Sequence, residues 1–163
     1  MAQTSDQASE AAQMITSGLS APSSATALKP FYLSYLATAH ESLGRFDDAR
    51  RSVREAIEII ETTKQVWCEA EAHRVAGEIA LKSPEADVTK AQAYFEHALS
   101  VARAQQAKSW ELRAAMSMAR LWRDQRKVQQ ARELLAPVYG WFTEGFDTLD
   151  LKEAKALLDE LAQ

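Results

Sequence analysis

The chain has 163 residues, of which 47% are hydrophobic and 26% are charged, and its formal net charge at pH 7 is −4. This length and composition predict one domain with one sizeable core, and the mixture of both charge signs argues against bulk attraction to nucleic acid. The single cysteine, Cys68, excludes an internal disulfide and suits a reducing compartment.

The N-terminal segment MAQTSDQASEAAQM is polar and lacks the basic and apolar regions of a signal peptide. No window approaches the roughly 18 consecutive apolar residues that a membrane-spanning helix needs. The chain contains only 5 glycines and 4 prolines, and its abundant Ala, Leu, Glu, Gln and Arg favour helix. We therefore expect an all-helical, cytoplasmic protein that binds neither membrane nor nucleic acid.

All predicted elements are helices, and in chain order they form a half repeat, three helix pairs and a final helix. The half repeat is one helix over residues 7–19. The pairs span residues 30–61, 65–105 and 110–140. The final helix, 149–162, carries an apolar stripe and a polar outer face, as a terminal capping helix requires.

A pattern of small and apolar residues recurs along the chain. In each copy an alanine is followed by an apolar residue four positions later and by small or apolar residues seven and eight positions later. These steps place the residues on one helix face. The copies begin at Ala11, Ala49, Ala91 and Ala131, so the steps between them are 38, 42 and 40 residues. Four copies at nearly constant spacing predict a helical repeat.

A second set of small residues lies on the other helix of each pair. These residues are Ala37, Gly77 and Ala119. Larger side chains there would push the paired helices apart, so we expect the small residues to mark points of close approach. The four tryptophans come at helical-pair spacing, and we expect most of them to pack between helices.

One unit, YLATAHESLGRFDDARRSVREAI, carries its signature residues at Leu36, Ala37, Ala39, Gly44, Phe46, Ala49, Val53 and Ala56. In these positions it resembles the tetratricopeptide repeat. The third unit has Arg126 where the turn glycine is expected, and the period of about 40 residues exceeds the roughly 34 of this repeat. The resemblance implies a right-handed α-solenoid of antiparallel helix pairs, with about 3.5 repeats and a C-terminal capping helix, in a single domain of residues 1–163.

The C-terminal stretches LAPVYGWFTEGFDT and DLKEAKALLDEL carry a more specific resemblance. They resemble the C-terminal repeat region of large bacterial signalling proteins, in which an adenylate or guanylate cyclase or regulator domain is followed by an ATPase module. The resemblance implies a regulatory or scaffolding segment whose partner is a protein, a peptide or another domain of its own chain. The 163 residues contain neither G-x4-G-K-[ST] nor G-x-G-x-x-G, so no phosphate-binding loop is predicted.

The repeat family forms a concave surface from the first helix of each pair. Carrying the family's groove positions onto this chain gives Phe31, Ser34, Thr38, Glu41, Glu71, Arg74, Glu78, Arg113, Met116, Arg120 and Arg123. The cationic set in the third pair would suit an acidic peptide or a C-terminal carboxylate through charge-assisted hydrogen bonds. The equal alternative is that these arginines pair with Glu71, Glu78 and Asp124. Ser34 and Thr38 stand where the family's carboxylate clamp has Lys and Asn, which argues against chaperone-tail binding.

No group of residues predicts catalysis, a cofactor or a metal. Glu69 and His73 share a helix face, but two ligands are too few for a closed metal site, so we expect them to be solvated or to pair helices. We expect His40 at the edge of the core and His97 on an outer face. Cys68 lacks the neighbours that redox or nucleophilic chemistry needs and is expected to be a packed thiol.

We therefore expect a non-enzymatic module for protein–protein interaction. The alternative is a structural spacer that relays conformational change from an upstream ATPase or cyclase module and has no ligand of its own. The half repeat 7–19 lacks its first helix, which leaves its apolar face without a cover and allows a homodimer through this end.

Overall fold

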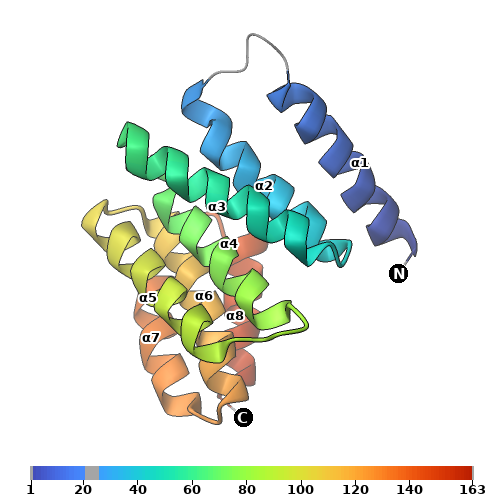
Figure 1. Cartoon of the computed structure of the whole chain (residues 1–163). Helices are drawn as coiled ribbons and strands as arrows, with labels where there is room; N and C mark the ends of the chain where they lie inside the picture. The colour runs from blue at the N-terminus through green and yellow to red at the C-terminus, as the bar shows by residue number, and fades with distance from the viewer. Residues whose placement is uncertain (1, 21–25, 163) are drawn as a thin grey trace.

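The computed structural model describes residues 2–20 and 26–162, so Met1, residues 21–25 and Gln163 of the expected domain 1–163 lie outside the described residues. The described residues form eight α-helices and two short 3-10 helices and contain no strand, which confirms the all-α prediction (Figure 1). In chain order these are α1 (Ala2–Leu19), η1 (Thr26–Leu28), α2 (Lys29–Ser42), α3 (Phe46–Thr63), η2 (Val66–Cys68), α4 (Glu69–Lys82), α5 (Val88–Ala104), α6 (Lys108–Asp124), α7 (Val128–Gly140) and α8 (Leu149–Glu160).

The helix boundaries lie close to those predicted, with one exception at the N-terminus. α2 and α3, α4 and α5, and α6 and α7 correspond to the three predicted pairs, and α8 corresponds to the final helix. Their ends differ from the predictions by a few residues, which is usual where helix ends fray. The first helix begins at Ala2 rather than at residue 7, because residues 2–6 contain no proline or glycine to stop it.

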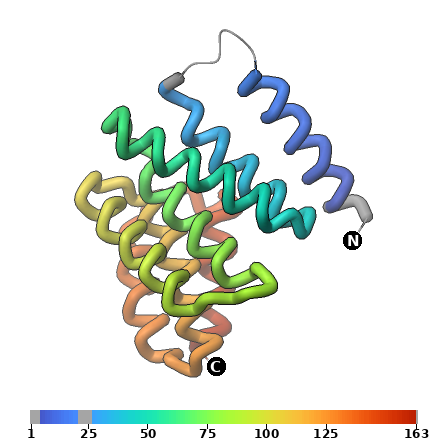
Figure 2. Tube along the Cα trace, viewed as in Figure 1, coloured from blue at the N-terminus to red at the C-terminus, as the bar shows by residue number. Residues whose placement is uncertain are grey.

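The helices pack in two layers. α2 packs against α4, α4 against α6, and α6 against α8, while α3, α5 and α7 each pack against the helices before and after them in the chain. α1 packs on α2 at one end of the row, and α7 and α8 lie at the other end (Figure 1). The tube in Figure 2 follows this row from the N-terminus to the C-terminus.

Small residues lie where neighbouring helices meet, as the repeat pattern predicts. The fully buried members of the pattern are Ala37, Ala49, Ala91, Ala119 and Ala131. In α1 the prediction is wrong by one residue, since Ala12 is buried and Ala11 is only partly buried. The physical reason is that α1 packs on α2 at the end of the row, so this one neighbour decides which face of α1 is covered.

Gly77 of α4 lies at a close approach to α5. A Cβ atom at this position would be 2.4 Å from Cε1 and 2.7 Å from Cδ1 of Phe95. The Phe95 ring is fully buried and packs in the main hydrophobic core. Glycine at position 77 therefore lets an aromatic ring lie directly against the α4 backbone.

Five of the described connections between helices contain a residue with left-handed backbone, including that between α7 and α8, where Gly145 has a φ of 77°. Gly44 has a φ of 71° between α2 and α3, and Arg126 has a φ of 62° at the corresponding place between α6 and α7. Lys64 and Gln106 adopt φ values of 58° and 55° after α3 and α5. These connections thus share a left-handed residue, although only those with Gly44 and Gly145 have the glycine that this conformation favours.

The final helix α8 packs on α6 and α7. Leu151, Leu157 and Leu161 are buried and Ala154 is fully buried, whereas Glu153 is exposed. The predicted apolar stripe and polar outer face are therefore confirmed. In the part of the chain that the structure describes, no helix has the length and apolar content required to cross a bilayer.

Candidate functional site

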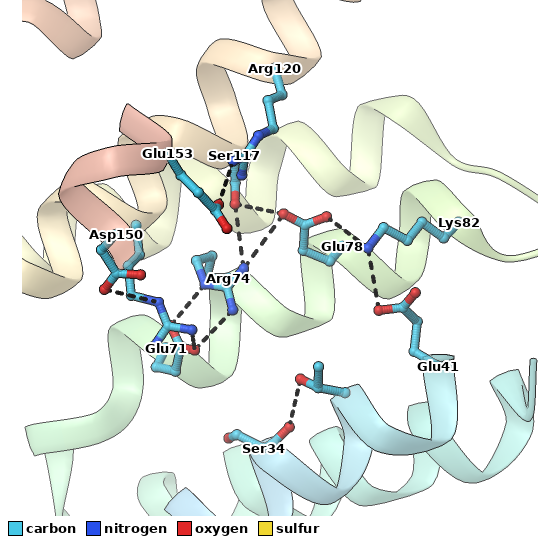
Figure 3. A network of polar contacts seen from close by, with 12 residues as sticks. Ser34, Glu41, Glu71, Arg74, Glu78, Lys82, Ser117, Arg120, Asp150 and Glu153 are labelled. Atoms are coloured by element: carbon cyan, nitrogen blue, oxygen red, sulfur yellow. Dashed lines mark hydrogen bonds and ion pairs between the residues drawn. The ribbon is translucent and has the colours of Figure 1, made fainter. Parts of the chain in front are cut away.

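The residues predicted for a peptide groove all lie on α2, α4 and α6. Three of them are too buried to meet a partner, and one of these, Glu71, belongs to a polar network. Ser34 is 1% exposed and its hydroxyl donates to the carbonyl oxygen of Pro30 at 3.0 Å, and Met116 is 3% exposed because it packs into the hydrophobic core. The others lie on one face together with Glu71, Lys82, Ser117 and side chains of α8, and Figure 3 shows the polar contacts in part of this face. We call this surface the even-helix face, formed by Phe31, Thr38, Glu41, Glu71, Arg74, Glu78, Lys82, Arg113, Ser117, Arg120, Arg123, Asp150, Glu153 and Glu160.

Glu71 is the centre of a buried ion-pair network. Its side chain is 3% exposed and accepts two hydrogen bonds from Arg74, at 2.8 and 2.9 Å. Arg113 of α6 reaches the same carboxylate, with Nη2 2.9 Å from Oε1. Burial alone would lower the pKa of Arg74, but the hydrogen bond and charge of Glu71, with further charge from Glu78 and Asp150, raise it. The guanidinium therefore stays charged inside the protein.

A chain of polar contacts extends this network across three helices (Figure 3). The Ser117 hydroxyl of α6 donates to Oε1 of Glu78 on α4 at 2.6 Å. Lys82 Nζ lies 3.6 Å from Oε2 of Glu78 and 3.3 Å from Oε2 of Glu41 on α2. The sequence analysis did not include Lys82, although its position four residues after Glu78 is a signal for an ion pair. Ser117 carries no such signal, because its partner comes from another helix.

The arginines of α6 have acidic partners on α8 or on α6 itself. Nη2 of Arg120 lies 2.9 Å from Oε2 of Glu153, and Nη1 of Arg123 lies 2.9 Å from Oε2 of Glu160. Arg123 also pairs with Asp124 at 2.9 Å. Each arginine of the predicted groove thus has a carboxylate partner within the chain. Glu71, Glu78 and Asp124 are partners that the second alternative named, whereas Glu153 and Glu160 of α8 were not predicted. Whether this face also binds a ligand stays a prediction.

Near the N-terminal end of α2 the even-helix face becomes aromatic. The ring centroid of Phe31 lies 4.7 Å from that of Tyr35, 5.2 Å from that of Trp67 and 6.4 Å from that of Trp110. The guanidinium carbon of Arg113 lies 5.5 Å from the Trp110 ring centroid, within cation–π range. We call Phe31, Tyr35, Trp67 and Trp110 the aromatic cluster.

Two of the four tryptophans are more exposed than the sequence analysis expected. Trp67 in the aromatic cluster is 40% exposed, and Trp141, which follows α7, is 59% exposed. Trp110 and Trp122 are partly buried, and Trp122 packs against the core. Tyr35 is also 41% exposed. Exposed aromatic residues that gather in one place mark a candidate contact surface.

A separate polar group lies between α4 and α5. Glu69 and His73 are one turn apart on α4, and the His97 side chain of α5 lies beside them. The two imidazole ring centroids are 4.1 Å apart, and Nε2 of His97 is 3.2 Å from Oε1 of Glu69. Burial and the charge of His97 lower the pKa of His73 to about 4. The sequence predicts the pairing of Glu69 with His73 but not the contact with His97, because periodicity alone places that half-exposed residue on an outer face.

The remaining chemically interesting residues are packed. Cys68 is fully buried, as expected of a packed thiol, and burial raises its pKa to about 11. His40 is partly buried, and burial lowers its pKa below the ordinary value. Both side chains therefore favour the uncharged form.

At least three hollows lie outside the even-helix face in the described part of the chain, the smallest of them about 280 Å³ beside α1 and His40. A groove of about 700 Å³ runs between α3, α4 and α5, and its lining includes Arg54, Glu58, His73 and Tyr94. An apolar hollow of about 440 Å³ lies between α1 and α2 and is lined in part by Met14. α2 thus covers only part of the apolar face of α1, and the expected homodimer through this end stays a prediction.

No protein-family model, no curated protein and no solved structure matches this chain. What the chain does is therefore inferred from its own residues. The even-helix face combines ion-paired side chains with the partly exposed rings of the aromatic cluster. Among the described residues, Glu69, His73 and His97 form the one group of three metal-ligating side chains close enough to share an ion.

Proposed function

We propose that the chain is a non-enzymatic helical-repeat module of the tetratricopeptide type that binds a protein or peptide partner. The small residues buried at near-constant spacing support repeated helix pairs. The left-handed turns at corresponding places support the same arrangement. The contacts among α2, α4, α6 and α8 would give such a right-handed solenoid one continuous inner layer, with α8 as its cap.

The aromatic cluster is the observation that carries the binding proposal. Tyr, Trp and Arg are the residue types that dominate binding energy at protein interfaces. Tyr35 and Trp67 hold their rings against Phe31 while about two fifths of each side chain stays exposed. A partner that covers these rings would bury aromatic surface without having to order it first.

The charges on the face favour an apolar or aromatic peptide over the acidic peptide expected from the sequence. Arg74, Arg113, Arg120 and Arg123 each lie within 4.0 Å of a carboxylate of the chain. An acidic ligand would have to displace these carboxylates, and the displaced Glu71 would remain buried without a partner. The arginines serve better as the polar rim of an aromatic contact surface.

The second candidate is a structural spacer without a ligand of its own. The continuous polar contacts from α2 through α4 to α6, and the ion pairs from α6 to α8, favour this role because they couple every helix of the inner layer. In either role the resemblance implies the regulatory repeat segment of a bacterial signalling protein, beside an adenylate or guanylate cyclase or ATPase module. The partner would then be another protein or another domain of the same chain.

A peptide-display selection separates the two candidates. The chain is presented to a random peptide library, and the enriched peptides are measured against Trp67→Ala, Tyr35→Ala and the control Trp141→Ala. We expect enriched peptides with apolar or aromatic anchors that lose affinity for the first two variants and keep it for the control. Enriched peptides that bind all variants equally would refute this surface, and the absence of any enrichment would favour the spacer.

A further inference from the structure

The group between α4 and α5 has the composition of a metal site. It combines two imidazoles and one carboxylate, and one ligand atom from each of Glu69, His73 and His97 lies within 4.8 Å of the others. Two ligands come from successive turns of one helix, and the third comes from a neighbouring helix. Two histidines with one glutamate also hold zinc in sites that keep a position open for water.

The distances suit an ion of zinc size. Zinc binds imidazole nitrogen and carboxylate oxygen at about 2.0–2.2 Å, which places tetrahedral ligand atoms about 3.3–3.5 Å apart. Nε2 of His97 and Oε1 of Glu69 are already 3.2 Å apart. The ligand atoms of the group lie up to 4.8 Å apart, so side chains must rotate to bring all three to the distances of a zinc site. His97 can move because half of its side chain is exposed.

The group is incompletely satisfied without a ligand. Nδ1 of His73 is buried and has no hydrogen-bond partner among the described residues. The ring centroids of His73 and His97 lie 4.1 Å apart with the ring planes tilted by 52°, and the Tyr94 ring centroid lies 5.9 Å from that of His73. A hydrogen bond to Glu69 explains the position of His97, but it leaves the buried Nδ1 of His73 without a partner among the described residues.

We propose that Glu69, His73 and His97 bind a divalent transition-metal ion of the zinc class. The ion would join α4 to α5 through the chain's own side chains. Because His73 also lines the groove between α3, α4 and α5, the site lies at the border of a space of about 700 Å³. Imidazole and carboxylate ligands favour Zn²⁺ over Mg²⁺ or Ca²⁺, which take oxygen ligands. This proposal does not depend on peptide binding by the aromatic cluster.

The test is a zinc titration of the untagged full chain after chelator treatment, followed by calorimetry. We expect saturable binding of one Zn²⁺ per chain and visible absorption bands typical of a tetrahedral site when Co²⁺ is used instead. Glu69→Gln and His97→Gln should each weaken zinc binding by at least about tenfold. Mutation of a residue that only hydrogen-bonds to a metal ligand already lowers metal affinity by about that factor. Circular dichroism with chelator present verifies that each variant keeps its helices.

Two matched controls distinguish this group from other zinc-binding side chains. His40→Gln removes a histidine of α2 outside the group, and Cys68→Ser removes the single thiol. Both variants should bind zinc as the unaltered chain does. The proposal is overturned if the helical chain binds no zinc, if Glu69→Gln and His97→Gln bind it undiminished, or if binding is lost in either control.

Discussion

Replacing Glu71 by glutamine removes the charge at the centre of the buried network while keeping the shape of the side chain. In the intact chain this carboxylate holds two arginines, and the Arg74 and Arg113 side chains are only 13% and 23% exposed. Breaking a buried ion pair costs about 3–5 kcal/mol, because the remaining charge is left without a partner. Glutamine keeps one acceptor oxygen, so we expect a loss of about 3 kcal/mol in the free energy of unfolding.

Glu153→Gln is the matched control, since it removes a carboxylate that pairs with Arg120 at 2.9 Å near the surface. Both partners of that pair are more than a third exposed, so the expected loss is below about 1 kcal/mol. Urea denaturation followed by circular dichroism measures both free energies under one set of conditions. Equal losses for the two variants, or a loss below about 1 kcal/mol for Glu71→Gln, would refute the buried network as a source of stability.

The remaining predictions concern packing and titration. Gly77→Ala should lower the free energy of unfolding by about 1–3 kcal/mol, because the added methyl group overlaps the Phe95 ring. Adding Phe95→Leu to this variant should reduce the loss. A Gly77→Ala variant as stable as the unaltered chain would contradict the close approach. Cys68 should react with a thiol reagent only as the chain unfolds, so equal rates in native and denatured protein would argue against its burial. Below the ordinary histidine pKa of 6.5 the unfolded chain gains a proton at His73, whereas the folded chain does not until about pH 4. Stability should therefore fall from about pH 7 to about pH 5, by at most about 2 kcal/mol for this residue, and a chain with His73→Gln that shows the same pH profile would exclude this cause.

The repeat could be predicted because its signals are local in the sequence. The spacing of Ala49, Ala91 and Ala131 located the buried faces of α3, α5 and α7 without knowledge of any contact. The pattern also placed Arg126 at a turn position equivalent to Gly44, and both residues have left-handed backbone. The pattern was wrong by one residue in α1, where Ala12 rather than Ala11 is buried. At this end of the row α1 has extensive contacts with α2 alone, so α2 decides which face of α1 is covered.

The candidate site was predictable in outline but not in its pairings. Helical spacing placed the arginines of α6 on the correct face, yet their partners Glu153 and Glu160 depend on how α8 docks more than 30 residues later in the chain. The contact of His97 with His73 depends in the same way on the rotation of α5 against α4. Exposure of Trp67 was missed, because the sequence shows a bulky aromatic residue but not which neighbours fail to cover it.

Hydrogen exchange, measured with and without a peptide selected on the chain, tests the central proposal most directly. Binding by the aromatic cluster predicts slower exchange of backbone amides in residues 31–35 of α2, in η2 around Trp67 and in the first turns of α6. The amides of α7, which contributes no residue to the even-helix face, should exchange at unchanged rates. Protection confined to α3, α5 or α7, with none in α2 and η2, would contradict the proposal that the even-helix face is the binding surface.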